Sequence, residues 1–391
     1  MWLNDRERGQ MRYRDLGKTG LRVSEIGLGG EWLERHNTEE VCAVIDACEK
    51  QGINILDCWM SEPNVRSNIG EAIKGRRERW IIQGHIGSTW QNGQYVRTRD
   101  ISQADTAFED LRTRMQTDYI DLGMIHFVDE VSEYEKIMSG EFLEYVRGLR
   151  QSGKIRHIGM SSHNPVVAKL AAESGIIEMI LFSLNPAFDL LPPSEDINTL
   201  FAEKYDEKLG GIAPEREELY KVCEKNGVGI TVMKGYAGGR LFQAEHSPFG
   251  VALTPVQCIH YALTRPAVAS IMVGYDTPAH VIAAVEYETA TDEEKDYASV
   301  LAGAPSHAFI SGQCTYCGHC APCPAEIDIA MVNKLLDLAE MQPVVPQSLH
   351  EHYRQLHANA SDCMACGGCE SRCPFHVQVI SRMERASVMF N

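Results

Sequence analysis

The sequence predicts an α/β fold: a (β/α)8 TIM barrel followed by a small, mainly α-helical domain. Two observations predict it. Eight short apolar segments rich in Ile, Val and Leu alternate with segments of helical composition over residues 11–290. Eight of the thirteen cysteines are crowded into residues 314–373. A chain of 391 residues is long enough for one such barrel and one further module.

The eight apolar segments are interpreted as strands buried on both faces, because each is a short, nearly continuous apolar run. Their residues are 23–28, 53–57, 80–86, 119–126, 155–160, 176–184, 229–234 and 268–273. Helical composition follows the strands, as at 38–50, 102–115, 132–150 and 214–225.

Helix starts support this count of units. Asn164-Pro165, Thr254-Pro255 and Thr277-Pro278 each place a capping side chain before a proline, whose missing N–H costs nothing at the first helical position. We therefore expect helices to begin at these three prolines.

The domain boundaries follow from these patterns. Residues 1–10 are an N-terminal extension, 11–290 the barrel, 291–313 a linker, and 314–391 the cysteine-rich domain. The connection 186–213 is long for a strand-to-helix loop and predicts either a lid or partner surface over the barrel mouth, or a merely solvated acidic loop. Its acidic residues are Asp189, Glu195, Asp196, Glu203, Asp206 and Glu207.

The composition excludes several classes of protein. A formal net charge of −17 repels phosphate backbones and anionic lipid surfaces, so neither nucleic acid nor membrane is expected as a partner. No long uncharged apolar stretch predicts a membrane span. The first residues lack the apolar core of a secretory signal, so a cytoplasmic location with reduced thiols is expected, in an anaerobic or facultative cell.

The C-terminal cysteines carry the most specific motif. Both runs have two-residue gaps and end in Cys-Pro, which is the spacing of two-cluster ferredoxins, where the last cysteine of each run ligates the other cluster. The pattern predicts two 4Fe-4S clusters, one on Cys314, Cys317, Cys320 and Cys373, the other on Cys363, Cys366, Cys369 and Cys323. The first run is one residue shorter than the common bacterial pattern, and paired Cys-x2-Cys motifs also bind zinc. The clusters could transfer electrons, or they could only stabilise the fold of the domain. The other cysteines, namely Cys42, Cys48, Cys58, Cys223 and Cys258, are expected in apolar surroundings.

Candidate catalytic residues lie at the C-terminal ends of the predicted strands, where barrel enzymes build their active sites. The polar or flexible tips in order are Asp57, His85, His126, Ser161 with Ser162, Asn185, Lys234 and Gly274. The first three end consecutive strands and are suited to general acid–base chemistry. Trp32 and Trp59 lie near tips as well and are candidate walls of a substrate pocket, or simple packing.

The barrel resembles the aldo-keto reductase family over residues 11–287. The resemblance rests on the segments 11–24, 52–57 and 117–122 and on His126. With its cysteine runs, the chain is most similar to the branch that carries a C-terminal ferredoxin-like domain. The resemblance implies a reduced nicotinamide cofactor, NAD(P)H, and a catalytic set of Asp, Tyr, Lys and His.

Two members of that catalytic set are replaced here. Asp57 and His126 stand at the family's Asp and His positions, whereas His85 stands at the lysine position and Glu62 at the tyrosine position. A carboxylate and an imidazole can move a proton, but they do not reproduce a phenol activated by an ammonium group. Asp57, Glu62, His85 and His126 are the predicted catalytic residues.

Cofactor binding is predicted at the rim. Ser161, Ser162 and Asn185 occupy positions that the resemblance places at the nicotinamide. The loops 234–240 and 274–280 are candidate phosphate sites because glycines and a helix N-terminus can approach an anion, or they are plain turns. Their candidate residues are Lys234, Arg240, Gly274 and Thr277. A flavin has no visible motif.

Three functions compete. The first is an oxidoreductase that acts on a small organic carbonyl or hydroxyl substrate while electrons pass through the two clusters. The second is a non-redox lyase or isomerase with structural clusters. The third is an electron-transfer subunit that docks a redox partner protein.

Overall fold

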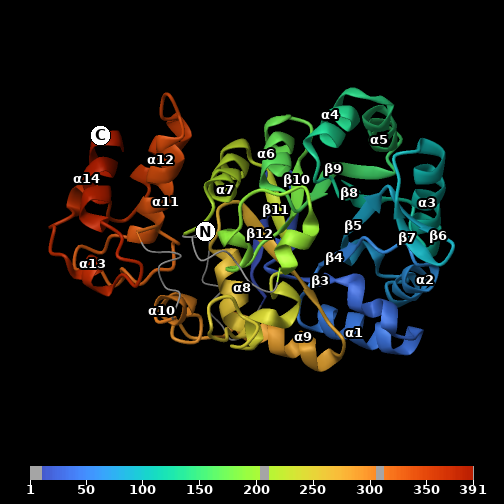
Figure 1. Ribbon diagram of the computed structural model, residues 1–391, viewed down its shortest axis with the longest axis horizontal. Helices are drawn as coiled ribbons and strands as arrows, with labels where there is room; N and C mark the ends of the chain where they lie inside the picture. The colour runs from blue at the N-terminus through green and yellow to red at the C-terminus, as the bar shows by residue number, and fades with distance from the viewer. Residues whose placement is uncertain (1–10, 203–210, 305–311, 391) are drawn as a thin grey trace.

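The computed structural model describes residues 11–202, 211–304 and 312–390, and the predicted N-terminal extension 1–10 lies outside these ranges. Eight parallel strands close into a barrel, as predicted, with helices around it (Figure 1). Each strand overlaps its predicted segment. In order around the barrel the strands are β3 (Ile26–Gly29), β4 (Ile55–Cys58), β5 (Ile81–Ile86), β8 (Ile120–Ile125), β9 (Ile155–Ser162), β10 (Met179–Ser183), β11 (Gly229–Met233) and β12 (Val268–Gly274).

Two antiparallel hairpins flank the barrel strands, and neither was predicted. The first pairs β1 (Tyr13–Asp15) with β2 (Arg22–Ser24), so the start of the predicted segment 23–28 belongs to this hairpin. Gly17 in its turn has φ +53°, and a Cβ there would lie 2.4 Å from the carbonyl oxygen of Gly227, so only glycine fits. The second hairpin pairs β6 (Ser88–Gln91) with β7 (Gln94–Arg97) directly after β5.

The helices follow the strands around the barrel. Their bounds are α1 (Thr38–Lys50), α2 (Pro63–Ala72), α3 (Ile101–Arg114), α4 (Val131–Ser139), α5 (Glu141–Gln151), α6 (Pro165–Glu173), α7 (Pro214–Asn226), α8 (Pro255–Leu263) and α9 (Pro278–Val285). The prediction of one helix over 132–150 was wrong, because Gly140 is extended and separates α4 from α5.

Two of the three predicted proline caps are confirmed. The side chain of Asn164 accepts a hydrogen bond from the N–H of Val166, and Thr254 accepts one from Gln257 within a full capping box. Thr277 precedes α9 as predicted, but its side chain makes no capping hydrogen bond. The cap function assigned to Thr277 was therefore wrong.

The C-terminal module is helical, as predicted, and lies beside α7 and α8 (Figure 1). Its helices are α11 (Ile329–Glu340), α12 (Gln347–Arg354), α13 (Gly368–Arg372) and α14 (Val379–Phe390). An ion pair of 2.9 Å joins Lys334 on α11 to Glu224 on α7.

The expected linker 291–313 is not an extended tether over its described part. It contains α10 (Tyr297–Ala302), whose residues Tyr297, Ala298 and Leu301 are buried, and α10 packs against α8. Apolar side chains within this segment account for the difference, because their burial stabilises a packed helix. Residues 305–311 lie outside the described residues.

A partly buried histidine at this junction predicts acid sensitivity. His260 on α8 packs against the rings of Tyr287 and Tyr297, and burial, aided by Lys295 and Arg265, lowers its pKa to about 4. The unfolded chain takes up that proton near pH 6.5, so His260 costs stability as the pH falls from 6.5 toward 4, by about 1.4 kcal/mol per pH unit. Urea unfolding of wild type and His260→Gln at pH 7.5 and 5.5 measures this. We expect the wild type to lose more stability than the variant, and equal losses would contradict the assignment.

Candidate functional site

Three of the predicted catalytic residues form one hydrogen-bonded chain at the barrel rim. The Nε2 atom of His85 lies 3.0 Å from Oδ1 of Asp57, and its Nδ1 atom lies 2.8 Å from Nδ1 of His126. Asp57 and His85 are 5% and 2% exposed, so solvent screens this chain weakly. The arrangement is a relay of one carboxylate and two imidazoles.

The strand register explains why these residues meet. Asp57 on β4 pairs with Gln83 on β5, and His85 lies two residues further along β5, so Gln83 and His85 point to the same face. His126 directly follows β8, and His85 pairs with Met124 on that strand, again two residues away. Side chains two residues apart on neighbouring strands therefore line up at the top of the barrel interior.

Gln83 is a site residue that the sequence analysis missed. Its amide nitrogen donates to Oδ1 of Asp57 at 2.9 Å, and its amide oxygen accepts from Thr231 on β11 at 2.7 Å. The hydrogen bond crosses the barrel from β5 to β11 and fixes the carboxylate that His85 contacts. The signal was available, because a glutamine in a buried strand two residues before His85 faces the same interior.

The environment keeps His126 neutral. Burial, followed by the nearby His85 and Arg99, holds the pKa of His126 well below 6.5. The guanidinium of Arg99 donates to the backbone oxygen of His126 at 2.6 Å, and burial lowers the pKa of Arg99 to about 10, so it stays positive at neutral pH. A neutral His126 has one ring nitrogen that accepts a proton and one that donates it.

Aromatic rings cover one side of the relay. Trp59 stacks on His126 with ring centroids 5.9 Å apart, and Tyr95 packs on Trp59 at 4.7 Å. Trp59 was a predicted pocket wall, whereas Tyr95 comes from the unpredicted β6–β7 hairpin. Trp32 lies elsewhere: it covers Gly274 and stacks with Arg35 at 4.3 Å.

Glu62 is not part of the hydrogen-bonded chain. Its carboxylate accepts a hydrogen bond of 2.7 Å from the N–H of Val65 and thereby caps α2. Within the described ranges it makes no hydrogen bond to His85 or His126. The contact that Glu62 makes is thus a structural one, at the start of α2.

The predicted nicotinamide-facing residues are buried and already engaged. The Oγ of Ser161 accepts from the N–H of Phe127 at 2.8 Å, and that of Ser162 donates to Asp129 at 3.1 Å. Asn185 donates to the backbone oxygen of Lys234 and accepts from two backbone N–H groups of its own turn. These side chains fit a nicotinamide amide poorly, because they are at most 3% exposed and their hydrogen bonds stabilise the local backbone.

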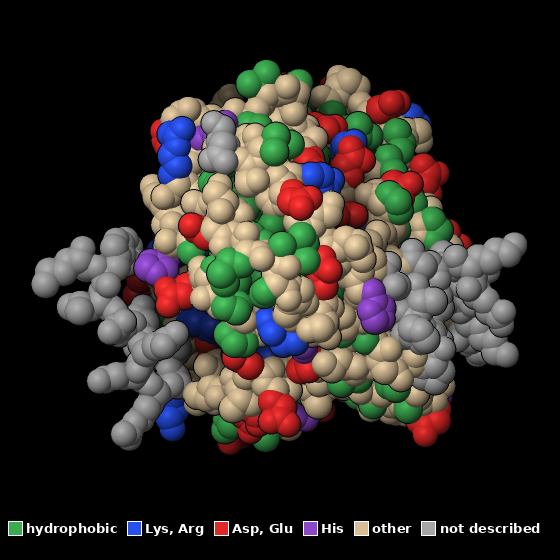
Figure 2. All heavy atoms as spheres, turned by 90° about the vertical axis from the view of Figure 1, so that its left-hand side faces the viewer, with side chains coloured by type: hydrophobic (Ala, Val, Ile, Leu, Met, Phe, Trp, Pro, Cys, Tyr) green, Lys and Arg blue, Asp and Glu red, His purple; other side chains and the backbone are tan. Residues whose placement is uncertain are grey.

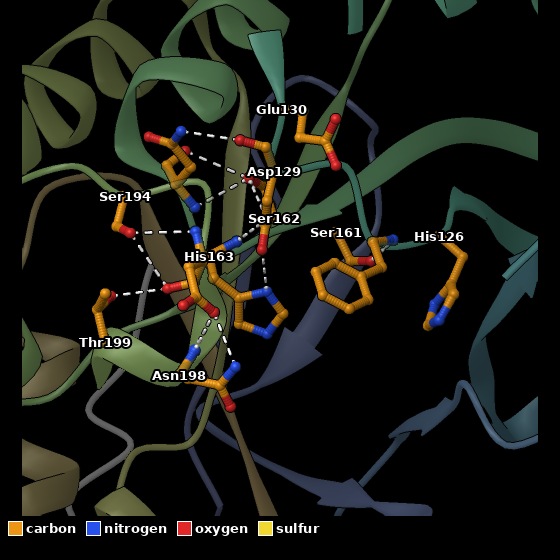
Figure 3. Close-up of polar contacts among 12 residues, drawn as sticks. His126, Asp129, Glu130, Ser161, Ser162, His163, Ser194, Asn198 and Thr199 are labelled. Atoms are coloured by element: carbon orange, nitrogen blue, oxygen red, sulfur yellow. Dashed lines mark hydrogen bonds and ion pairs between the residues drawn. The ribbon is translucent and has the colours of Figure 1, made fainter. Parts of the chain in front are cut away.

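A buried histidine and carboxylate next to these serines were missed. The Nδ1 atom of His163 lies 2.9 Å from Asp129, which also accepts from the N–H of His163 and from Ser162 (Figure 3). The ring of Phe127 lies 5.0 Å from that of His163. Burial lowers the pKa of His163 despite its contact with Asp129. The cluster orders the turn after β9.

The two predicted phosphate loops are held by protein contacts. The guanidinium of Arg240 donates to the backbone oxygen of Ala202 at 3.0 Å, and Lys234 has φ +60° at the end of β11. In the second loop, Asp276 forms an ion pair of 2.8 Å with His36, and Trp32 lies on Gly274. A carboxylate in that loop opposes the binding of a phosphate.

The long connection 186–213 is less acidic at its surface than expected. Asp189 is fully buried, so its assignment to an acidic lid or solvated loop was wrong. It accepts hydrogen bonds from Tyr220 and, at 2.8 Å, from Tyr261. Glu195 accepts from the N–H of Val131, and Asp196 caps a short helix over Ile197–Phe201. Glu203, Asp206 and Glu207 lie outside the described residues.

The C-terminal cysteines surround a cavity that fits a cluster. Cys323, Cys363, Cys366 and Cys369, the set predicted for one cluster, line the same open pocket, together with the apolar side chains of Ile327, Ile329 and Met383. No three histidine, cysteine or acidic side chains among the described residues converge on a point that could hold a single ion. The donor set of four cysteines fits a 4Fe-4S cubane.

The cysteines of the first run are partly buried. Burial raises the pKa of Cys314 and of Cys320 to about 12, so both would have to release a proton to bind a metal. The earlier, scattered cysteines are free. Four of them are buried and Cys42 partly so, as expected.

The fold and these cysteines define the class: a (β/α)8 barrel enzyme with an iron–sulfur module. The sequence matches the Aldo/keto reductase family over residues 25–253 and the 4Fe-4S dicluster domain over 313–378. The chain belongs to the aldo/keto reductase family and is an oxidoreductase with a C-terminal 4Fe-4S domain.

Relatives agree with this assignment. The oxidoreductase YqkF of Bacillus subtilis (strain 168) is 28% identical over 279 residues, which cover 68% of this chain and 87% of that protein. Aldo-keto reductase YhdN of the same strain is 32% identical over 165 residues, 39% of this chain and 47% of that protein. The solved holo form of aldo-keto reductase AKR11C1 from Bacillus halodurans superposes with a TM-score of 0.57 at 24% identity, covering 75% of this chain and 96% of that one.

No helix of the described residues is both long and apolar enough to cross a bilayer.

Proposed function

We propose that this protein reduces or oxidises a small organic carbonyl or hydroxyl substrate and exchanges the electrons through two 4Fe-4S clusters bound by the eight C-terminal cysteines. The observation that carries the proposal is the relay of Asp57, His85 and His126 at the barrel rim. It provides a proton path where the family uses tyrosine and lysine.

The proton moves along the relay in a defined order. Because Asp57 accepts from Nε2–H of His85, we assign Nδ1 of His85 as the acceptor for Nδ1–H of His126. The free Nε2 of His126 then takes the proton of a substrate hydroxyl, while its Nδ1 proton passes to His85. The resulting positive charge lies beside Asp57, which stabilises it. In the reduction direction the same steps run backwards and His126 gives a proton to the carbonyl oxygen.

The electrons are supplied separately from the protons. Reduction of a carbonyl to a hydroxyl takes two electrons and two protons. The relay gives one proton to the oxygen, and solvent water gives the other to the carbon. Two 4Fe-4S clusters, each a one-electron carrier when bound, hold the electron pair. Cys323, Cys363, Cys366 and Cys369 are the ligands of one, and Cys314, Cys317, Cys320 and Cys373 those of the other. No step is assigned to NAD(P)H, since Ser161, Ser162 and Asn185 fit a nicotinamide poorly.

The aromatic wall indicates the substrate class. Trp59 and Tyr95 present ring faces beside His126, which favours a substrate with an apolar or aromatic group next to its carbonyl. The pocket offers no described arginine or lysine in contact with the relay, other than the backbone-bound Arg99. A neutral aromatic aldehyde or ketone is the substrate that these contacts favour.

The test is an anaerobic stopped-flow experiment. Dithionite-reduced protein is mixed with aromatic and aliphatic aldehydes and ketones while the cluster absorbance is followed. We expect at least one carbonyl compound to reoxidise the clusters, with NADH and NADPH unnecessary. His126→Ala is the matched variant: it should reduce with dithionite normally and then reoxidise far more slowly. Clusters that stay reduced with every compound would overturn the proposal.

A non-redox acid–base reaction is the second candidate, because the relay itself contains no electron carrier. It predicts turnover of a substrate by protein that has never been reduced, and loss of this turnover in His85→Ala. Dependence of turnover on reduced clusters would exclude it.

A further inference from the structure

A buried arginine of the barrel lies against the first cysteine run. Arg265 follows α8 and is 3% exposed. Its Nη2 donates to the backbone oxygen of Thr315 at 2.5 Å and to the hydroxyl of Tyr297 at 3.2 Å. Thr315 directly follows Cys314, so a barrel side chain holds the loop that carries the first predicted ligands.

The guanidinium of Arg265 lies over the ring of Tyr261 at 4.4 Å and has no direct ion pair among the described residues. Within the described ranges, no carboxylate forms an ion pair with it, and its buried Nε has no hydrogen-bond partner. Burial opposes its charge, but Tyr261, Tyr297 and the more distant Asp189 raise the pKa of Arg265, so it remains protonated. A buried, protonated and unpaired arginine is costly unless an anion lies nearby.

The residues next to Arg265 indicate which anion balances its charge. A small pocket is lined by Arg265 together with Cys314 and Tyr316, and the carboxylate of Glu217 in the same lining is paired with Lys221 at 2.9 Å. A cluster held by four thiolates is a net anion, and its negative charge increases when it is reduced. Charges buried at this depth are screened little by solvent or salt.

The neighbouring arginines differ from Arg265. Arg382 lies near Cys314 but is paired with Asp337 at 2.5 Å. Arg372 donates to the backbone oxygens of Cys320 and Pro322, but it is exposed, so solvent weakens its field. Arg265 is therefore the buried arginine that faces the first cysteine run without a carboxylate partner in the described chain.

We propose that Arg265 is the barrel's counter-charge to the cluster of Cys314, Cys317, Cys320 and Cys373, and that it raises the reduction potential of this cluster above that of the other. This inference rests on the two-cluster assignment in the proposed function. With the higher potential, the cluster of the first run is the one that is reduced first. Arg265 is a positioning residue, because its hydrogen bonds reach Thr315 rather than a ligand sulfur.

The experiment is a redox titration of the intact, cluster-loaded protein followed by electron paramagnetic resonance, without substrate. We expect two distinct potentials in the wild type. In Arg265→Gln the higher one should fall so that the ratio of reduced to oxidised cluster at a fixed potential decreases at least tenfold, which is 59 mV for a one-electron couple. The lower potential should move much less.

Two further variants keep the outcome interpretable. Arg265→Lys retains the charge and should keep most of the difference between the potentials, even if the loss of the Thr315 contact weakens the fold. Arg77→Gln removes a partly buried arginine of the barrel, bound to Asp121 at 2.8 Å, and should leave both potentials unchanged. Unchanged potentials in Arg265→Gln, or equal shifts of both clusters, would overturn this inference alone. Protein that contains no iron would instead contradict the proposed function on which this inference rests.

Discussion

His126→Ala is expected to lower kcat by about 10²- to 10⁴-fold on any carbonyl substrate that the wild type reduces, because it removes the group that exchanges the proton with substrate oxygen. Steady-state assays with reduced clusters measure this. Since the pKa of His126 is held well below 6.5, its neutral form persists at mildly acidic pH. The rate of hydroxyl oxidation should therefore stay level from pH 8 to 6 in the wild type and fall only below this range.

Asp57→Asn and His157→Gln complete the test. The first variant keeps the shape of the relay but removes the charge that stabilises protonated His85, so kcat should fall while KM changes little. His157 on β9 pairs with Glu178 at 3.0 Å, away from the relay, and its replacement should leave kcat unchanged. A kcat for His126→Ala near that of the wild type would show that another group moves the proton.

Paired cysteine variants are expected to reveal which ligands share a cluster. If Cys323 completes the set of Cys363, Cys366 and Cys369, then Cys323→Ala with Cys363→Ala damages a single cluster, whereas Cys323→Ala with Cys314→Ala damages both. Iron should fall from about eight atoms per chain to about four in the first double variant and to nearly none in the second. Anaerobic iron analysis and resonance spectra measure these values.

Cys258→Ala is the control for this series, because its thiol is buried in the barrel and burial raises its pKa, as for an inert cysteine. It should retain all the iron. The opposite pattern would assign Cys323 to the first run. In that case the Cys323→Ala, Cys314→Ala double variant would lose about four iron atoms, and the Cys323→Ala, Cys363→Ala double variant would lose all of them.

The barrel was predictable because buried parallel strands read as continuous apolar runs, and all eight were found. The hairpins of β1–β2 and β6–β7 were not, since each strand has only three or four residues and β1 and β7 are largely exposed. The helix break at Gly140 depends on the approach of the Lys136 carbonyl oxygen, which would lie 2.5 Å from an added Cβ. Such a contact between backbone segments leaves no periodic pattern in the sequence.

The relay was predictable in part. Asp57, His85 and His126 end consecutive strands, and adjacent strands bring their ends together. The neutral state of His126, the support from Gln83 and the aromatic cover by Tyr95 depend on register and burial. Asp189 shows the opposite error: its acidic neighbours suggested exposure, but Tyr220 and Tyr261 donate to it in the interior.

The position of the iron–sulfur module beside α7 and α8 has a kinetic consequence. The relay opens at the ends of β4, β5 and β8, whereas Met364 and Cys366 of the module are exposed. Figure 2 shows the molecule from the side on which the module lies, where hydrophobic and charged side chains are mixed. On the proposed function, an electron donor would reach the module and an organic substrate would reach the barrel rim, at two separate places. The electron donor and the substrate could then be bound at the same time, so saturation with one should not appear as competitive inhibition toward the other.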